Sequence, residues 1–153
     1  MLKLERLVAR CCLAAGLLAL LGCGGGDGIT IVPTEGTVTV DGKPLERIMV
    51  EFWPESEGPR SYAQTDAAGH FVLTTDDGKR QGAALGTHKV TLKDMIVYNN
   101  KFLGRAAEGM SNNSSGEKAR IADKYSLPTS TTITQVVEKG KTNVFNVEVD
   151  TKK

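Results

Sequence analysis

Several features that would point to a function are scarce in this sequence of 153 residues. Aromatic residues make up 5% of the chain and its formal net charge is +1, so the excess of basic groups that binds nucleic acid or an anionic membrane surface is missing. The apolar run near its start is too short to cross a bilayer, which needs about 20 residues. The composition therefore favours one soluble domain and no nucleic-acid partner.

The N-terminal stretch has the pattern of an export signal. Three basic residues, the last of them Arg10, precede an uncharged run of eleven residues, Cys11 to Leu21, and the apolar region of a secretory signal spans about 7–15 residues. The run closes on Leu20-Leu21-Gly22-Cys23, which resembles the cleavage box of bacterial lipoprotein signals. This resemblance implies a signal peptide over 1–22, a diacylglyceryl group on the sulfur of Cys23 and usually an acyl chain on its new amine.

Cysteine use agrees with a lipid anchor. Cys11 and Cys12 lie in the segment expected to be removed, so the exported chain keeps only Cys23 and forms no internal disulfide. The alternative is an ordinary signal peptide with a chance cysteine near its end. We expect the glycine-rich residues 23–34 to form a tether. The expected location is the bacterial cell envelope, with the exported chain held on the membrane by lipid.

Beyond the tether, residues 35–150 alternate apolar and polar side chains over short stretches separated by turn residues. This period of two predicts strands with one buried face, and no segment has the pattern of a long amphipathic helix. Seven short strands favour an all-β fold in which two sheets bury their apolar faces against each other. The expected strands cover 37–40, 48–53, 61–65, 70–75, 87–93, 132–138 and 144–149.

The same alternation assigns faces and turns. In strand 48–53 the even-numbered residues are expected in the core, and the odd-numbered ones, Trp53 among them, on the opposite face. Asp41-Gly42 predicts a tight turn, because glycine tolerates a positive φ. Asp66-Ala67-Ala68-Gly69 is expected to close a hairpin between the strands that flank it.

Motifs in a fixed order carry a resemblance to a known family: Gly36-Thr37-Val38-Thr39-Val40-Asp41-Gly42-Lys43-Pro44-Leu45, then Thr65-Asp66-Ala67-Ala68-Gly69-His70-Phe71, then Ala122-Asp123-Lys124-Tyr125 and Thr129-Ser130. Together with the signal, they resemble bacterial lipoproteins with a carboxypeptidase-regulatory-like, transthyretin-like β-sandwich. The resemblance spans most of residues 35–149 and implies a seven-stranded sandwich of that type. The sequence departs from the family in its long loop at 94–118 and in Gln135, where an apolar residue is usual. The resemblance supplies no catalytic residues.

Residues suited to catalysis or metal binding are sparse. After the signal the only histidines are His70 and His88, on different expected strands, and we interpret both as partly solvated strand residues. Asp76-Asp77-Gly78 resembles a fragment of a calcium loop without its alternating acidic ligands, so a solvated turn is the better interpretation. A Gly-x-Ser-x-Gly nucleophile elbow is missing. The sequence therefore predicts no enzyme, no cofactor and no metal site.

Two surfaces are candidates for binding. Trp53, beside Glu51 and near Tyr62, has the character of an aromatic platform that stacks on a sugar ring. The alternative is that Trp53 caps the edge of the sandwich or packs under the long loop, since large aromatics are usually mostly buried. The loop at 94–118 contains Tyr98 among other apolar residues, and loops beyond about 12–15 residues are usually functional or disordered.

These observations lead to two alternative functions. The first is a lipid-anchored, non-catalytic β-sandwich of the cell envelope that serves adhesion, scaffolding or protein interaction. The second is a polysaccharide-binding module that uses exposed aromatics, with Trp53, Tyr62 and Tyr98 as candidate ligand-binding residues. The expected partners are accordingly the membrane, through lipid on Cys23, and an envelope protein or a polysaccharide.

Overall fold

The computed structural model describes residues 28–98 and 118–151. Across these residues the chain is all-β, and its helical structure consists of two 3₁₀ turns, η1 (Met95–Tyr98) and η3 (Asp123–Tyr125). The strands are β1 (Ile31–Val32), β2 (Thr34–Val40), β3 (Lys43–Pro44), β4 (Ile48–Pro54), β5 (Ser61–Gln64), β6 (His70–Val72), β7 (Thr74–Thr75), β8 (Ala83–Ala84), β9 (Gly86–Asp94), β10 (Thr134–Val137) and β11 (Asn143–Val149).

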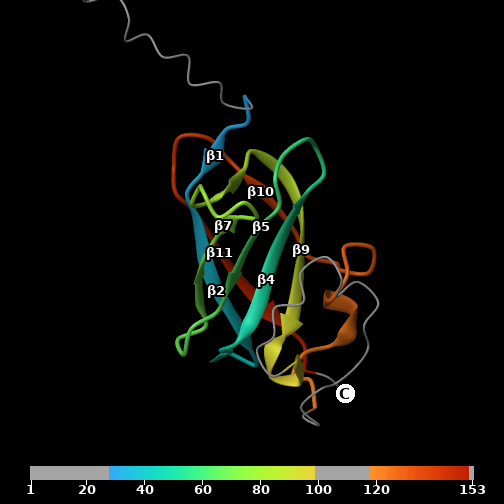
Figure 1. Ribbon diagram of the computed structural model, residues 1–153. Helices are drawn as coiled ribbons and strands as arrows, with labels where there is room; N and C mark the ends of the chain where they lie inside the picture. Colours follow the sequence, from blue (N-terminus) through green and yellow to red (C-terminus); the bar gives the residue numbers. More distant parts are fainter. Residues whose placement is uncertain (1–27, 99–117, 152–153) are drawn as a thin grey trace, which may run out of the picture.

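The strands form two main sheets and one small pair (Figure 1). A five-stranded antiparallel sheet has the order β10-β9-β4-β5-β7. In the four-stranded sheet, β2 pairs with β11 on one side and with β3 and β6 on the other, and β2 and β11 run parallel. β1 and β8 form the small pair at one end of the body.

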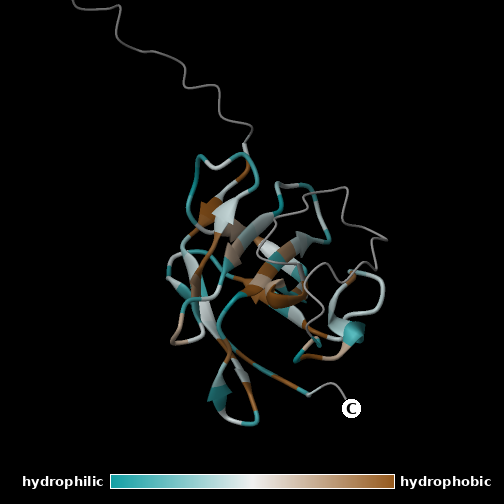
Figure 2. Ribbon diagram, turned by 60° about the horizontal axis from the view of Figure 1, so that its bottom comes forward, coloured by the Kyte–Doolittle hydropathy of each residue, from teal (hydrophilic) through white to brown (hydrophobic). Residues whose placement is uncertain are grey.

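The core lies between the two main sheets, where their inward side chains meet. Phe52 of β4 is fully buried, and its ring lies 6.5 Å from that of Phe71 and 5.7 Å from that of Phe145, measured between centroids. Val38 and Leu92 also have at most 1% of their surface exposed. Figure 2 shows hydrophobic strand segments at the centre of the body. Each large apolar side chain buried in this way stabilises the fold by about 1.5–3 kcal/mol.

Every strand expected from the sequence overlaps a strand of the structure, and the even-numbered residues of β4 from Ile48 to Phe52 are in the core as predicted. The expected tight turn is also confirmed: Asp41 and Gly42 have φ values of 48° and 72°, and they join β2 to β3. Two successive positive φ values are the signature of a type I′ hairpin turn. Ordered structure begins earlier than expected, because β1 lies within the range 23–34 predicted as a tether.

The predicted hairpin around Asp66–Gly69 is wrong. The turn forms as expected, with Gly69 at φ 71° and the Asp66 carboxylate accepting bonds from two backbone amides, but the strands on either side do not pair. β5 pairs with β4 and β7, whereas β6 pairs with β2 in the other sheet. The stretch expected as one strand, 70–75, is divided at the fully buried Leu73, whose amide donates to Thr34 across the four-stranded sheet. The turn therefore carries the chain from one sheet to the other.

His88 also differs from its interpretation as a partly solvated residue. It occupies an inward position of β9 and is fully buried, with its ring 5.6 Å from that of Phe52. Nδ1 lies 3.0 Å from the carbonyl oxygen of Gly86, while Nε2 has no hydrogen-bond partner among the residues that the structure describes. Burial lowers the pKa of His88, because the charged imidazolium is poorly solvated there. His70, in contrast, is half-buried as expected.

We therefore expect stability to fall as the pH drops below 6.5, the ordinary pKa of histidine. Below that value the unfolded chain binds a proton at His88 that the folded chain resists, so acid favours unfolding. Urea unfolding at about pH 7.5 and about pH 5.5 measures this effect above the range where carboxylates titrate. His88→Asn keeps a donor toward Gly86 and should show a smaller fall. Equal falls in both proteins would contradict the assignment.

Candidate functional site

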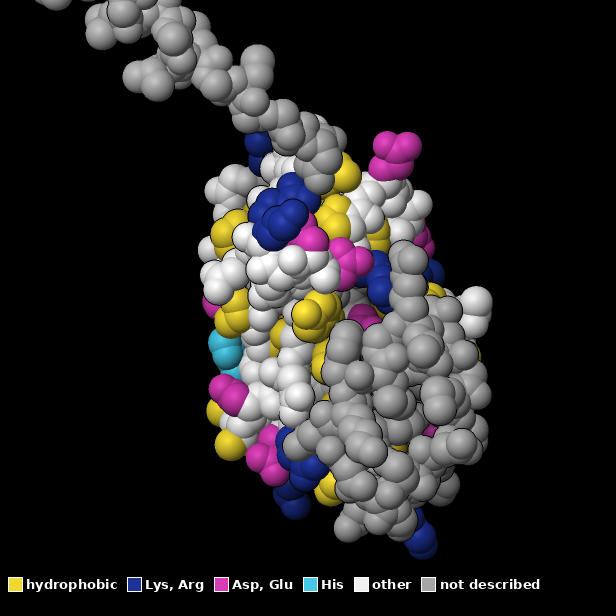
Figure 3. Space-filling model, viewed as in Figure 1, with side chains coloured by type: hydrophobic (Ala, Val, Ile, Leu, Met, Phe, Trp, Pro, Cys, Tyr) yellow, Lys and Arg dark blue, Asp and Glu magenta, His cyan; other side chains and the backbone are white. Residues whose placement is uncertain are grey.

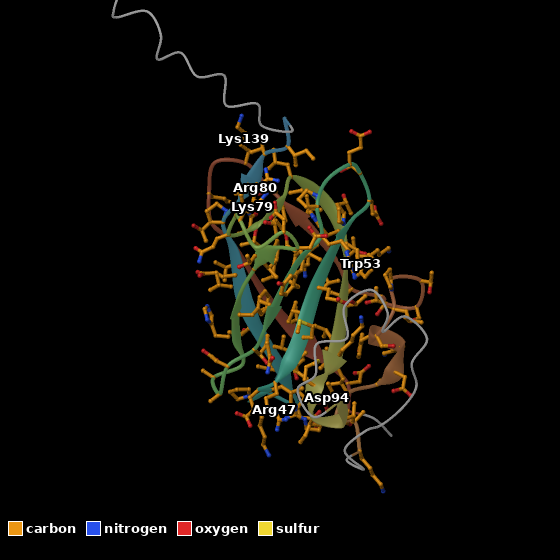
Figure 4. The ribbon with its side chains drawn as sticks, viewed as in Figure 1. Arg47, Trp53, Lys79, Arg80, Asp94 and Lys139 are labelled. Carbon is orange, nitrogen blue, oxygen red and sulfur yellow. The ribbon has the colours of Figure 1, made fainter. Side chains whose placement is uncertain are left out.

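The aromatic residues predicted as a platform lie on the outer face of the five-stranded sheet, away from the core. Trp53 is near the end of β4 and Tyr62 is in β5, where it pairs with Glu51, so the two aromatics are diagonal neighbours. Both are half-buried, and Figure 4 shows the position of Trp53 beside β9. Of the other predicted site residues, Tyr98 ends η1 with a side chain that is not described, and Cys23 lies outside the described residues.

The indole of Trp53 is fixed by two contacts. Its Nε1 donates a hydrogen bond to Thr91 Oγ1 of β9 at 3.1 Å, and the guanidinium carbon of Arg60 lies 4.3 Å from the ring centroid. A cation over an indole contributes about 0.5–1 kcal/mol at an exposed site and more when desolvated. Arg60 thus occupies the position on one ring face where a stacked sugar would lie.

A buried ion pair lies beside the indole. Lys93 Nζ is 2.8 Å from Glu51 Oε2, and the Thr91 hydroxyl donates to the same oxygen at 2.9 Å. The two charged side chains are only 15% and 8% exposed. Thr91 accepts from the Trp53 indole while donating to Glu51, so the indole, hydroxyl, carboxylate and ammonium form one continuous polar chain across β4 and β9.

The sequence did not predict this network, because alternation places Glu51 and Lys93 on the side facing away from the core. Glu51 and Met49 are nevertheless only 6% exposed. The signal that reveals the pair is the register of β4 against β9, in which Glu51 lies opposite Thr91 and Met49 opposite Lys93. A period of two identifies the face of a strand and says nothing about its lateral neighbours.

The chemistry available at this face is hydrogen bonding and charge pairing. The Glu51 carboxylate is already neutralised by Lys93, and Lys89 lies 3.8 Å from Glu55. In the ranges 28–98 and 118–151, no three His, Cys, Asp or Glu side chains are grouped so that they could hold a metal ion. Figure 3 shows the described acidic and basic side chains interspersed on the visible face. On this face the indole of Trp53 and the Glu51–Lys93 pair are thus held by contacts within the protein.

A second buried charge lies at the end of the body opposite β1 (Figures 1 and 4). The Asp94 side chain is 1% exposed and accepts two bonds from the Arg120 guanidinium, from Nε at 3.0 Å and from Nη2 at 2.8 Å. The Arg120 backbone amide donates to Asp94 Oδ2 at 2.8 Å, and Nη2 also donates to the Glu46 carbonyl at 2.7 Å. This Asp94–Arg120 clamp joins the end of β9 to the segment that follows residue 117.

The outer face of the four-stranded sheet has a different character. Thr37 donates to Asn146 at 2.8 Å, and the Glu148 carboxylate accepts bonds from the Thr39 hydroxyl and the Gly42 amide. These donors lower the pKa of Glu148, the hydroxyl of Thr39 contributing most. On this face the polar side chains of β2 and β11 therefore bond to one another across the two strands.

Comparison with known proteins adds no family to this description: no family model, curated protein or solved structure matches the chain. Among the described residues, no helix has the length and apolar character needed to cross a membrane.

Proposed function

We propose that the protein is a lipid-anchored, non-catalytic interaction module of the bacterial cell envelope, with a transthyretin-like sandwich as its body. The observation that carries the proposal is the signal pattern ending at Leu20-Leu21-Gly22-Cys23, followed closely by a folded all-β body. The described structure begins at Gly28, three residues before β1, and β1 lies at one end of that body (Figure 1). The five residues from Gly24 to Gly28 span at most about 18 Å, so the body stands close to the membrane.

The fold supports the proposed type of domain. Two sheets with mostly antiparallel strands enclose one core, and the chain passes between them at Leu73, so both sheets belong to one unit. Such a body presents faces, edges and turns close to a membrane. That is the property an adhesion, scaffolding or protein-interaction module needs.

Protein interaction is favoured over polysaccharide binding by the surroundings of Trp53. A sugar stacks on an open aromatic face, and the guanidinium of Arg60 already lies over one face of this ring. The indole N–H, which would bond a sugar hydroxyl, donates to Thr91 instead. A glycan would have to displace contacts that the protein makes for itself.

Metabolic labelling with a palmitate analogue tests the anchor. We expect the full chain, expressed in a bacterium, to carry the label and to fractionate with membranes, whereas Cys23→Ser should lack the label and accumulate with its signal uncleaved. Each buried methylene contributes about 0.8 kcal/mol, so two or three acyl chains hold the protein firmly. Cys12→Ser is the matched control and should be labelled normally. An unlabelled, soluble wild-type protein would overturn the proposal.

A further inference from the structure

The edge strands on the two sides (flanks) of the sandwich differ in length and composition. On one flank the sheets end in β3, β6 and β7, which are two or three residues long. β3 consists of the exposed residues Lys43 and Pro44. Short length, lysine and proline are the devices by which proteins prevent a sheet edge from pairing with another chain. This flank is therefore protected against strand addition.

The opposite flank has few such devices. β11 ends the four-stranded sheet and is seven residues long, and β10 ends the five-stranded sheet. Within the described ranges, no strand pairs with the outer side of β11. β11 contains no proline, lysine or arginine, and its one charged residue, Glu148, is bound across the sheet by Thr39 and Gly42. Its outer backbone groups are thus a template for another strand.

Apolar side chains are exposed on this same flank. Val144 of β11 and Val136 of β10 are 59% and 52% exposed, the highest values among the large hydrophobic residues that the structure describes. The two strands are held together by Asn143, whose side chain accepts from the Glu138 amide and donates to the Glu138 carbonyl, both at 3.0 Å. The open edge of β11 is thereby kept in a fixed position.

We infer that β11 is a strand-addition site, which takes an extended segment of a partner protein as a new edge strand of the four-stranded sheet. Backbone hydrogen bonds provide the affinity in this mode of recognition, and alternate side chains provide the specificity. The incoming segment places an apolar residue beside Val144 and an uncharged or basic residue beside Glu148. This inference names the kind of partner for the interaction module. It rests on the proposed function only in choosing another protein over a second copy of this chain.

The proposed membrane anchor argues against a second copy of this chain as the occupant of the β11 edge. Two β11 edges related by a two-fold axis pair antiparallel, and the strands run along the long axis of the body (Figure 1). Such a dimer would place the two Gly28 ends at opposite ends of the assembly. Two copies anchored through Cys23 in one membrane have both of these ends on the same side, so the occupant is a segment of another protein.

Binding to peptides tests the inference. An array of peptides of about 15 residues that tile the envelope proteins of the bacterium is probed with the full chain in detergent; β11 needs only seven residues for complete pairing. We expect peptides that bind the wild type to lose about tenfold or more in affinity for Val144→Lys, because the added charge lies beside the pairing edge. Val72→Lys is the matched control: Val72 is 42% exposed, on the protected flank, and should bind normally.

Hydrogen exchange locates the bound peptide, and those amides of residues 143–149 that do not already bond to β2 should become protected. The inference is overturned if no peptide binds, if Val144→Lys binds as well as the wild type, or if protection appears elsewhere. A dimer in sedimentation that Val144→Lys dissociates would assign the edge to a second copy and overturn the choice of partner. Peptide binding in detergent does not depend on the lipid, whereas palmitate labelling does, so the two proposals fail separately.

Discussion

Replacing Asp94 with alanine is expected to lower the free energy of unfolding by about 3 kcal/mol, the cost of removing one partner of a buried ion pair. The Asp94 carboxylate accepts bonds from the Arg120 guanidinium, from the Arg120 amide and, at 3.3 Å, from the Ile96 amide. Alanine leaves these donors without their acceptor in a place where the Asp94 side chain is 1% exposed. The Arg120 side chain is 31% exposed, which limits the loss because water reaches part of the guanidinium.

Urea unfolding followed by the fluorescence of Trp53, the only tryptophan, measures this loss. In a double-mutant cycle, Asp94→Ala with Arg120→Ala should be less damaging than the sum of the single changes, by about 1 kcal/mol or more, because the partners are in direct contact. Glu57→Ala removes an exposed carboxylate and serves as the control, with an expected change within about 0.5 kcal/mol. A loss for Asp94→Ala no larger than for Glu57→Ala would show that the clamp does not stabilise the fold.

Gly36→Ala is expected to have a comparable effect for a steric reason. A Cβ at this position would lie 1.9 Å from the Phe145 carbonyl oxygen and 2.8 Å from Cζ of Phe71. The first of these atoms belongs to the backbone of β11, so relief requires β2 and β11 to separate. We expect a loss of about 3 kcal/mol, at the upper end of the usual cost of overpacking.

Gly140→Ala separates this close approach from the general effect of replacing a glycine. Gly140 has open space around its Cβ position and a φ of 87°, so alanine there meets only backbone strain of about 1–2 kcal/mol. Urea unfolding should rank Gly36→Ala as the more destabilising change, and hydrogen exchange should show faster exchange of the β11 amides. Equal stability of the two variants would mean that β2 and β11 accommodate the added methyl group at little cost in free energy.

The sequence predicts the strands of this protein well because the alternation of apolar and polar residues within each strand shows which of its faces is buried. The period of two in β4 and β11 places Phe52 and Val147 in the core without any knowledge of their neighbours. Which strands pair with each other is harder to predict from the sequence. The turn at Asp66–Gly69 has hairpin chemistry, yet β6 pairs with β2 because the inward Phe71 and Leu73 fill the space between two sheets.

The candidate site was predicted only in part for the same reason. Trp53 lies on the outer face as its position in β4 requires, but the contacts of its ring come from Arg60, just before β5, and from Thr91 of β9. The burial of His88 is likewise a property of the packed sheets, since the ring lies against Phe52 of the adjacent strand. Lateral contacts arise only when the strand order is known.

The parallel pair of β2 and β11 has a consequence for biogenesis. It joins the beginning and the end of the domain, and Thr37 bonds to Asn146 across a separation of 109 residues. Contacts between such distant positions slow folding, because chain entropy is lost before they form. The four-stranded sheet also cannot be completed until β11, the last strand, has been translated. For a protein exported as we propose, this delay favours passage of an open polypeptide through the membrane ahead of folding on the far side.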